Sequence, residues 1–368
     1  KQFVIKSVRS VCDDNCGFVY SRAIAHGIEM AKAYATLKGE YAYFSAYGYG
    51  VQPYGGNDFF YFITDSNTYK ERRNFSLIVK MIVGTLNALK ILHDAGLINR
   101  DIKPENLVYN DNHEVSFIDL DTTIKIEEQS RYSGCGTPAY KTKQLRAEQS
   151  RHSKTSDLVA MARVIFNLLQ GKLYTDRNQL KEAAFYEDVA TPTWESRPPS
   201  LNNFGLLTQA NYQSLIKAYQ LMGDEENTHI TVDTMLNCFK LLHEDLQQPT
   251  ARDATFNRFD NALSEHRAIT AANKLLMSYQ PSGSWFMMTK EMRARRYQLQ
   301  TLSRKMCETD SRERAKTILS EGKEPFKKPR INCFWYKRKQ TERSEIKTDA
   351  IRQIDSAISI LEQATPTQ

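Results

Sequence analysis

The sequence lacks the features that would indicate disulfide staples, a structural zinc site or a membrane span. Its six cysteines are scattered, form no CxxC pair and lie near no histidine cluster. Because a chain of 368 residues can bury a core without disulfides, we expect free thiols in a reducing, cytoplasmic compartment. No apolar run reaches the roughly 18 residues that span a bilayer, and the longest, 158–169, is interrupted by Arg163 and Asn167. We therefore predict a buried core helix there and no transmembrane segment.

A net excess of positive charge is also confined to a single region. Hydrophobic residues make up 41% and charged residues 25% of the chain, which is typical of a folded globular protein. The net charge is +7, yet residues 289–347 hold 18 Lys and Arg against 8 Asp and Glu, so the rest of the chain sums to −3. We interpret 289–347 as a helical bundle with a cationic surface. The alternative is a dock for an acidic protein partner or an anionic membrane surface, and nucleic acid is disfavoured.

Hydrophobic periodicity divides the chain into a mixed first part and a helical second part. A strand is expected at 3–6, a helix at 21–38, aromatic-rich strands at 41–51 and 59–64, and an amphipathic helix at 76–95 that ends at Gly96. Short strands at 107–109 and 115–118 flank a turn, and the chain is mostly helical after Asp157. Beyond a compositional shift near residue 247 we expect four helices and a basic, Pro-containing stretch at 324–339; the helices are 253–279, 285–307, 311–321 and 345–363.

One polar loop and a nearby strand end carry the candidate chemistry. Residues 99–106 read Asn-Arg-Asp-Ile-Lys-Pro-Glu-Asn, and Asp119 closes a predicted strand. Phosphoryl transfer from a nucleotide needs a carboxylate that orients the attacking hydroxyl, a cation near the moving group and oxygen ligands for Mg²⁺. Asp101, Lys103, Asn106 and Asp119 supply that set.

These residues resemble the active-site motifs of eukaryotic-type protein kinases. The loop is similar to the catalytic loop H-R-D-x-K-x-x-N, and 119–121 is similar to the D-F-G motif. The resemblance implies that Asp101 is the catalytic base, that Lys103 contacts the γ-phosphate of ATP, and that Asn106 and Asp119 bind Mg²⁺. Lys103 followed by Pro-Glu-Asn is the serine/threonine form of the motif.

Further segments follow the family pattern over about residues 1–243. Residues 3–6 resemble the V-A-I-K strand, which implies that Lys6 binds the α- and β-phosphates and that Glu29 pairs with it; a solvated helix face is the alternative for Glu29. Residues 136–140 resemble the end of an activation segment, where Thr137 would bond Asp101 and Lys103. Asp157 matches the residue that braces the backbone of the catalytic loop.

Several positions depart from the pattern. Asn99 replaces the usual His, and Leu120 and Asp121 replace Phe and Gly; Asp121 can still take the positive φ that the Gly position allows. Gln144 and His229 replace the Glu–Arg pair that braces the lobe, and because both partners are neutral we predict a rewritten brace between them.

The Gly-rich phosphate loop of the family has no counterpart before Lys6. Only five residues precede Lys6, and the chain opens without an initiator Met or a signal sequence. We expect the first two strands to lie upstream in the natural chain; a kinase relic is the alternative. Arg100 implies control by a phosphorylated residue in the activation loop, with Ser130 and Ser133 as candidate autophosphorylation sites and an unmodified loop as the alternative.

The predicted fold is α+β: a protein-kinase-like two-lobe fold with an appended all-α domain. A partial β-rich N-lobe is expected at 1–64, a helical C-lobe at 65–246 and a basic helical extension at 247–368. The leading function is an ATP- and Mg²⁺-dependent serine/threonine kinase of protein substrates; the alternatives are a pseudokinase scaffold and a small-molecule kinase. The helical extension is similar in style to those of effectors that intracellular bacteria translocate into host cells, which implies the host cytosol as location.

Overall fold

The chain forms two compact units in the computed structural model, Lys1–Phe256 and Asn257–Gln368. The sequence boundary was predicted about ten residues earlier, at 246/247. The residues that the structure describes are 3–7, 30, 33–34, 43–45, 49–128, 135–170, 209–247, 256–279, 290–309, 311–327 and 337–363. Most of the predicted helix 21–38 lies outside them.

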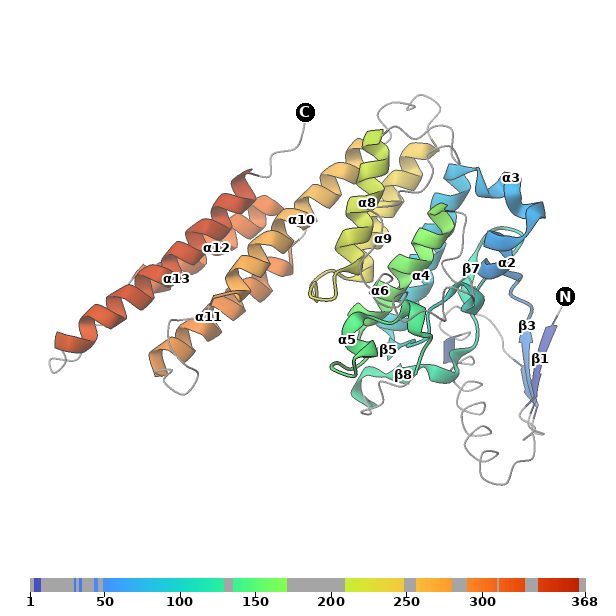
Figure 1. Ribbon diagram of the computed structural model, residues 1–368, viewed down its shortest axis with the longest axis horizontal. Coiled ribbons are helices and arrows are strands. Elements are labelled where there is room, and N and C mark those ends of the chain that lie inside the picture. The colour runs from blue at the N-terminus through green and yellow to red at the C-terminus, as the bar shows by residue number, and fades with distance from the viewer. Residues whose placement is uncertain are drawn as a thin grey trace, which may run out of the picture. The chain divides into compact units, whose positions relative to one another are not determined.

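The first unit opens with a three-stranded antiparallel sheet of order β1-β3-β2, of which Figure 1 labels β1 and β3 side by side. Its strands are β1 (Phe3–Ser7), β2 (Tyr43–Ser45) and β3 (Tyr49–Pro53). Lys6 lies opposite Gly50 in the register of β1 and β3. The single strand predicted at 41–51 is therefore two strands that pair with each other.

The strand predicted at 59–64 is wrong, because these residues form helix α2 (Phe59–Thr64) after the short strand β4 (Asn57–Asp58). The Asp58 carboxylate accepts the backbone N–H of Tyr61 and caps the helix. Phe59, Phe62 and Ile63 are buried while Tyr61 is 39% exposed, which is a helical spacing and not the alternation of a strand. The buried rings of Phe59 and Phe62 pack against Tyr109.

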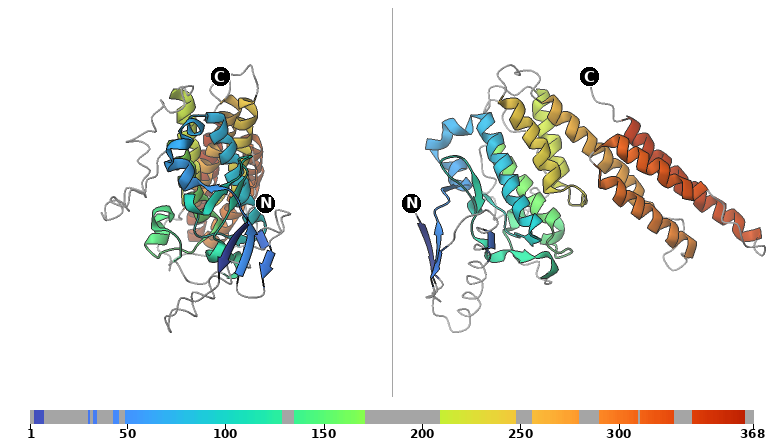
Figure 2. Two further views of the ribbon diagram at one scale, coloured as in Figure 1. Left: turned by 90° about the vertical axis from the view of Figure 1, so that its right-hand side faces the viewer. Right: turned by 180° about the vertical axis from the view of Figure 1, so that it is seen from behind.

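In the described part of the helical lobe four long helices pack together: α4 contacts α9 and α6, and α6 contacts α8 (Figures 1 and 2). Helix α4 ends just before Gly96, whose φ of +72° suits the left-handed position after a helix. The remaining helices of the lobe are shorter. The bounds are α3 (Tyr69–Arg72), α4 (Phe75–Asp94), α5 (Lys143–Arg146), α6 (Lys154–Gln170), α8 (Gln209–Gly223) and α9 (Val232–Leu246).

Helix α4 is the one described helix that is long and apolar enough, by length and composition, to cross a membrane. The sequence had singled out 158–169 instead. More than half of the α4 stretch is buried inside the protein, where side chains such as Ile78, Ile82 and Leu89 have no exposed surface. It therefore serves as a core helix of the lobe.

Two small sheets hold the loops between α4 and α6. One has the order β4-β6-β7 and the other pairs β5 with β8. The turn predicted at 110–112 is present: the Asn110 side chain accepts the backbone N–H groups of Asn112 and Glu114. The strands are β5 (Leu97–Ile98), β6 (Leu107–Tyr109), β7 (Val115–Phe117) and β8 (Ile124–Lys125), and the 3-10 turns of the unit are Ser66–Thr68, Pro104–Asn106, Leu120–Thr122, Ile126–Glu128 and Pro138–Tyr140.

Among its described residues, the second unit is a bundle of four helices with its own apolar core. Helix α10 contacts α11, α12 and α13, and α13 also contacts α11 and α12. Helix α12 continues through Pro325, so the predicted break at 324–339 is partly wrong. The helices are α10 (Asn257–Met277), α11 (Lys290–Cys307), α12 (Arg312–Lys327) and α13 (Lys337–Gln363); the core includes Leu276, Leu299, Met306, Leu319, Phe326, Ile354 and Leu361.

A bidentate ion pair fastens the start of α12 to α10. The Glu265 carboxylate accepts the backbone N–H of Arg312 at 2.7 Å and its Nε at 2.6 Å. Arg312 is 9% exposed, so these donors have little access to replacement water.

We expect Glu265→Gln to lower the free energy of unfolding of the helical unit by about 1–2 kcal/mol, because the charge-assisted pair becomes a neutral contact. Glu313→Gln is the matched control, since that side chain is 83% exposed; it should change stability by less than about 0.5 kcal/mol. Urea unfolding followed by circular dichroism measures both, and equal effects would contradict the assigned role of Glu265.

Candidate active site

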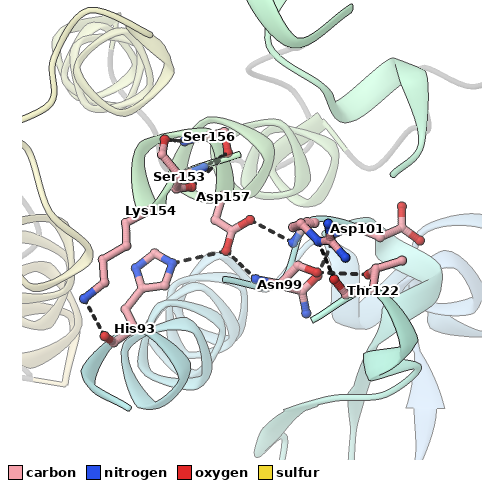
Figure 3. A network of polar contacts seen from close by, with 9 residues as sticks. His93, Asn99, Asp101, Thr122, Ser153, Lys154, Ser156 and Asp157 are labelled. Atoms are coloured by element: carbon pink, nitrogen blue, oxygen red, sulfur yellow. Dashed lines mark hydrogen bonds and ion pairs between the residues drawn. The ribbon is translucent and has the colours of Figure 1, made fainter. Parts of the chain in front are cut away.

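The candidate catalytic loop begins directly after β5 and is held by Asp157 on the first turn of α6 (Figure 3). The Asp157 carboxylate accepts the backbone N–H of Asn99 at 2.7 Å and that of Arg100 at 3.0 Å. Its Oδ2 also lies 3.2 Å from Nε2 of His93 on α4. Asp157 is 2% exposed and Asn99 1% exposed, so the bracing contact predicted for Asp157 is present and shielded from water.

Helix α6 begins at Lys154, where Ser153 and Ser156 form a reciprocal N-terminal cap. The Ser153 N–H donates to the Ser156 hydroxyl at 2.8 Å, and the Ser156 N–H donates to the Ser153 hydroxyl at 3.1 Å. Lys154 also donates to the carbonyl of His93, which ties the start of α6 to the end of α4. Figure 3 shows the two serines above Asp157 and the Lys154–His93 contact to its left.

Asn99 and Arg100 shape the turn that presents Asp101. Asn99 Oδ1 accepts the Asp101 N–H at 3.0 Å, so the Asn that replaces the family's His holds the loop by its own side chain. Arg100 has a φ of +73°, and its Nε donates to the carbonyl of Thr122 at 2.5 Å. The Thr122 hydroxyl in turn donates to the carbonyl of Asn99 at 2.9 Å. These bonds join the catalytic loop to the segment that follows Asp119.

Three predicted site residues converge on the carboxylate of a fourth, Asp101. Its Oδ1 accepts the backbone N–H and the hydroxyl of Thr137, each at 2.8 Å. Its Oδ2 lies 3.0 Å from Lys103 Nζ and accepts Asn106 Nδ2 at 3.1 Å. Lys103 also donates to the Thr137 hydroxyl at 3.2 Å, so the predicted contact of Thr137 with both residues is present. The Asp101 and Lys103 side chains are 13% and 23% exposed, which leaves the cluster partly open.

Gly136 permits the close approach of the activation segment to the loop. Its φ is +90°, and a Cβ there would lie 2.3 Å from the carbonyl oxygen of Arg100. Only glycine fits both conditions without a shift of the backbone. Thr137, the next residue, thereby reaches Asp101.

Asp119 follows β7 in the left-handed conformation, with φ 54° and ψ 59°. Positive φ had been considered for Asp121, but Asp121 lies in the 3-10 turn Leu120–Thr122 and has no positive φ. Leu120 is 1% exposed, which agrees with the apolar packing predicted for it. The Ile118 N–H donates to the carbonyl of Asn106 at 3.0 Å, so the two candidate metal ligands sit on hydrogen-bonded neighbouring segments.

The donor set at these segments fits Mg²⁺ delivered with a nucleotide. Asn106 uses Nδ2 on the carbonyl and carboxylate of Asp101, which leaves its Oδ1 oxygen for a cation. Asp119 supplies a carboxylate, and Mg²⁺ prefers oxygen ligands from one or two side chains together with phosphates. Within the described part of the chain no group of three or more His, Cys, Asp or Glu could form a metal cage.

Other predicted site residues are placed only in part. Lys6 lies in β1, but its side chain is outside the described residues, as are Glu29, Ser130 and Ser133. The Gln144–His229 brace stays a prediction. In the structure the Gln144 N–H donates to the Glu225 carboxylate at 3.2 Å, and the Lys143 N–H donates to the same group.

The sequence did not predict the residues that support the candidate site by hydrogen bonds from other parts of the fold. Thr122 and Glu225 contact the loop or the activation segment, as do Arg163 and Asn167 on α6. His93 contacts the loop's brace, Asp157. Arg163 and Asn167 did stand out as polar interruptions of an apolar run, and that was the available signal. The others belong to no motif and are brought to the site by the fold.

The family profile of the protein kinase domain matches residues 49–321, which is most of the chain. Human serine/threonine-protein kinase DCLK2 is 26% identical over 234 residues, covering 61% of this chain and 29% of that protein. A probable serine/threonine-protein kinase of Dictyostelium discoideum is 29% identical over 118 residues, covering 32% of this chain and 9% of that protein. The matches thus span less than a third of these relatives.

With the two-lobe fold, these findings place the chain in the protein kinase domain family, as a divergent member of the eukaryotic type. The resemblance had been predicted over residues 1–243, whereas the match begins at 49 and extends into the helical unit through most of α12.

Removing the Asp157 carboxylate should destabilise the first unit strongly. Asp157→Ala leaves two buried N–H groups without an acceptor, at a cost of about 3 kcal/mol or more; Asp157→Asn keeps one acceptor oxygen and should lose less. Asp111→Ala, at an exposed turn, is the control with an expected change within about 0.5 kcal/mol. Urea unfolding of the three variants tests this order, and a stable Asp157→Ala would refute it.

Gly136→Ala and Gly96→Ala separate backbone strain from steric conflict. Both glycines have positive φ, but a Cβ at Gly96 meets nothing within 4 Å. Gly96→Ala should cost about 1–2 kcal/mol from strain alone, and Gly136→Ala should cost clearly more because of the Arg100 carbonyl. Thermal unfolding compares the two, and an equal loss would show that the segment yields freely.

Proposed function

We propose that the protein is an ATP- and Mg²⁺-dependent serine/threonine kinase of protein substrates. The observation that carries the proposal is the convergence of Lys103, Asn106 and Thr137 on the Asp101 carboxylate. The relatives named as serine/threonine-protein kinases support the same acceptor class.

Each member of the cluster has a part in the transfer. Asp101 orients the acceptor hydroxyl and accepts its proton as the oxygen attacks. Lys103, whose ammonium lies 3.0 Å from Asp101 Oδ2, balances negative charge that develops on the transferred group. Asn106 and Asp119 would hold Mg²⁺, which neutralises the phosphate oxygens when bound. Lys6 would bind the α- and β-phosphates, a role that stays a prediction.

Thr137 supports a small hydroxyl acceptor at the cluster. Its own hydroxyl donates to Asp101 and accepts from Lys103, which shows that an alcohol fits between the two charged groups. A serine or threonine side chain of a substrate presents the same chemistry. The cytosolic location, the effector role and the acidic or membrane partner of 289–347 stay predictions from the sequence.

Turnover of Mg-ATP on a generic protein substrate tests the proposal. Asp101→Asn removes the proton acceptor while keeping the shape, so we expect turnover to fall about 100-fold or more. Asp111→Asn is the matched control at an exposed turn and should retain wild-type turnover. Chelation of Mg²⁺ should abolish turnover in the wild type and in Asp111→Asn. Equal background rates for wild type and Asp101→Asn would favour the pseudokinase scaffold.

A further inference from the structure

A guanidinium group lies buried in the middle of α6, where the apolar face of the helix meets the end of the activation segment. Arg163 is 9% exposed, and Leu158, Val159 and Val164 nearby on the helix are buried with it. Burial lowers the pKa of the Arg163 guanidinium, although arginine stays charged in proteins. A buried charge is costly unless hydrogen bonds satisfy it, so its contacts indicate its use.

The Arg163 guanidinium donates hydrogen bonds to the backbone of two residues. Its Nη1 donates to the carbonyl of Ala139 at 3.1 Å and to the carbonyl of Lys141 at 2.5 Å. One turn further along α6, Asn167 Nδ2 donates to the Tyr140 hydroxyl at 2.9 Å. Residues four apart share one face of a helix, and this face therefore holds three consecutive residues of the segment.

A second set of groups stabilises the charge and the next stretch of the segment. Tyr219 on α8 and Glu225 between α8 and α9 both favour the charged form and oppose the effect of burial on the pKa of Arg163. Glu225 also accepts the N–H groups of Lys143 and Gln144 at the start of α5. Residues 139–144 are thus held by two charged side chains of opposite sign.

This segment borders the acceptor site. Thr137, which contacts Asp101 and Lys103, precedes Ala139 by two residues and Lys141 by four. Since each residue spans at most about 3.6 Å, the residues that Arg163 holds lie within roughly 15 Å of Thr137. A substrate polypeptide whose hydroxyl reaches Asp101 must pass over the protein surface next to Asp101. Residues 138–141 form the part of that surface that follows Thr137 in the chain.

We propose that Arg163 is a positioning residue for the polypeptide substrate. By its hydrogen bonds to Ala139 and Lys141, it fixes the surface on which the substrate chain lies next to its acceptor hydroxyl. Arg163 touches neither substrate nor nucleotide. The inference rests on the proposed kinase function for its kinetic readout, but the fixing of the segment can be measured without turnover.

Kinetics of the full chain separate positioning from general stability. Arg163→Met removes both hydrogen bonds to the segment and should raise KM for a protein substrate about tenfold or more, while KM for ATP stays within about twofold of wild type. Arg163→Lys keeps the charge but has no planar fork, and it should give an intermediate KM. Arg151→Met, an exposed arginine before α6, should match wild type. An unchanged protein-substrate KM in folded Arg163→Met would overturn the proposal.

Hydrogen exchange of the same variants tests the structural step by itself. Amides of 136–146 should exchange faster in Arg163→Met than in wild type or Arg151→Met, while those of α4 and α9 keep their rates. If Arg163→Met does not fold, Arg163→Lys decides by the same comparison. A uniform rise across the unit would show a general core role and overturn the proposal. Absence of turnover in wild type would remove the kinase function, and the exchange result would still decide whether Arg163 fixes the segment.

Discussion

The candidate active site depends first on one buried carboxylate. Asp157 accepts the N–H groups of Asn99 and Arg100 and so fixes the backbone just before the candidate base. Without it, two donors would be stranded where water cannot replace the acceptor. Two further contacts of the loop depend on the backbone direction that Asp157 sets. They join the Asn99 side chain to Asp101 and Arg100 to Thr122.

Helix α6 extends this control from the catalytic loop to the activation segment. Its first turn carries Asp157, and its later turns carry Arg163 and Asn167, which contact residues 139–141. The other residues between Asp157 and Asn167 are apolar and buried, which fixes the positions of the three polar side chains. One helix therefore holds both the catalytic loop and the activation segment, which meet at Asp101.

Local sequence failed where burial, and not propensity, decided the structure. Residues 59–64 are rich in aromatics and were predicted as a strand, but the Asp58 cap and the packing of Phe59 and Phe62 on Tyr109 make them a helix. Helix α12 passes through Pro325 although proline normally ends a helix. Positive φ falls on Asp119 and not on Asp121, because the chain turns directly after β7.

The sequence by itself determined the family and the candidate reacting groups, because Asp101, Lys103, Asn106 and Asp119 are close in the chain and belong to its motifs. It also predicted the contacts of Thr137 and the bracing by Asp157, because those residues belong to motifs. Only the tertiary structure decided what supports them. Arg163 and Glu225 are distant in sequence from the backbone groups they hold, and a hydrogen bond to a backbone carbonyl or N–H leaves no trace in the identity of the partner residue. Such contacts become visible only once the fold has brought the segments together.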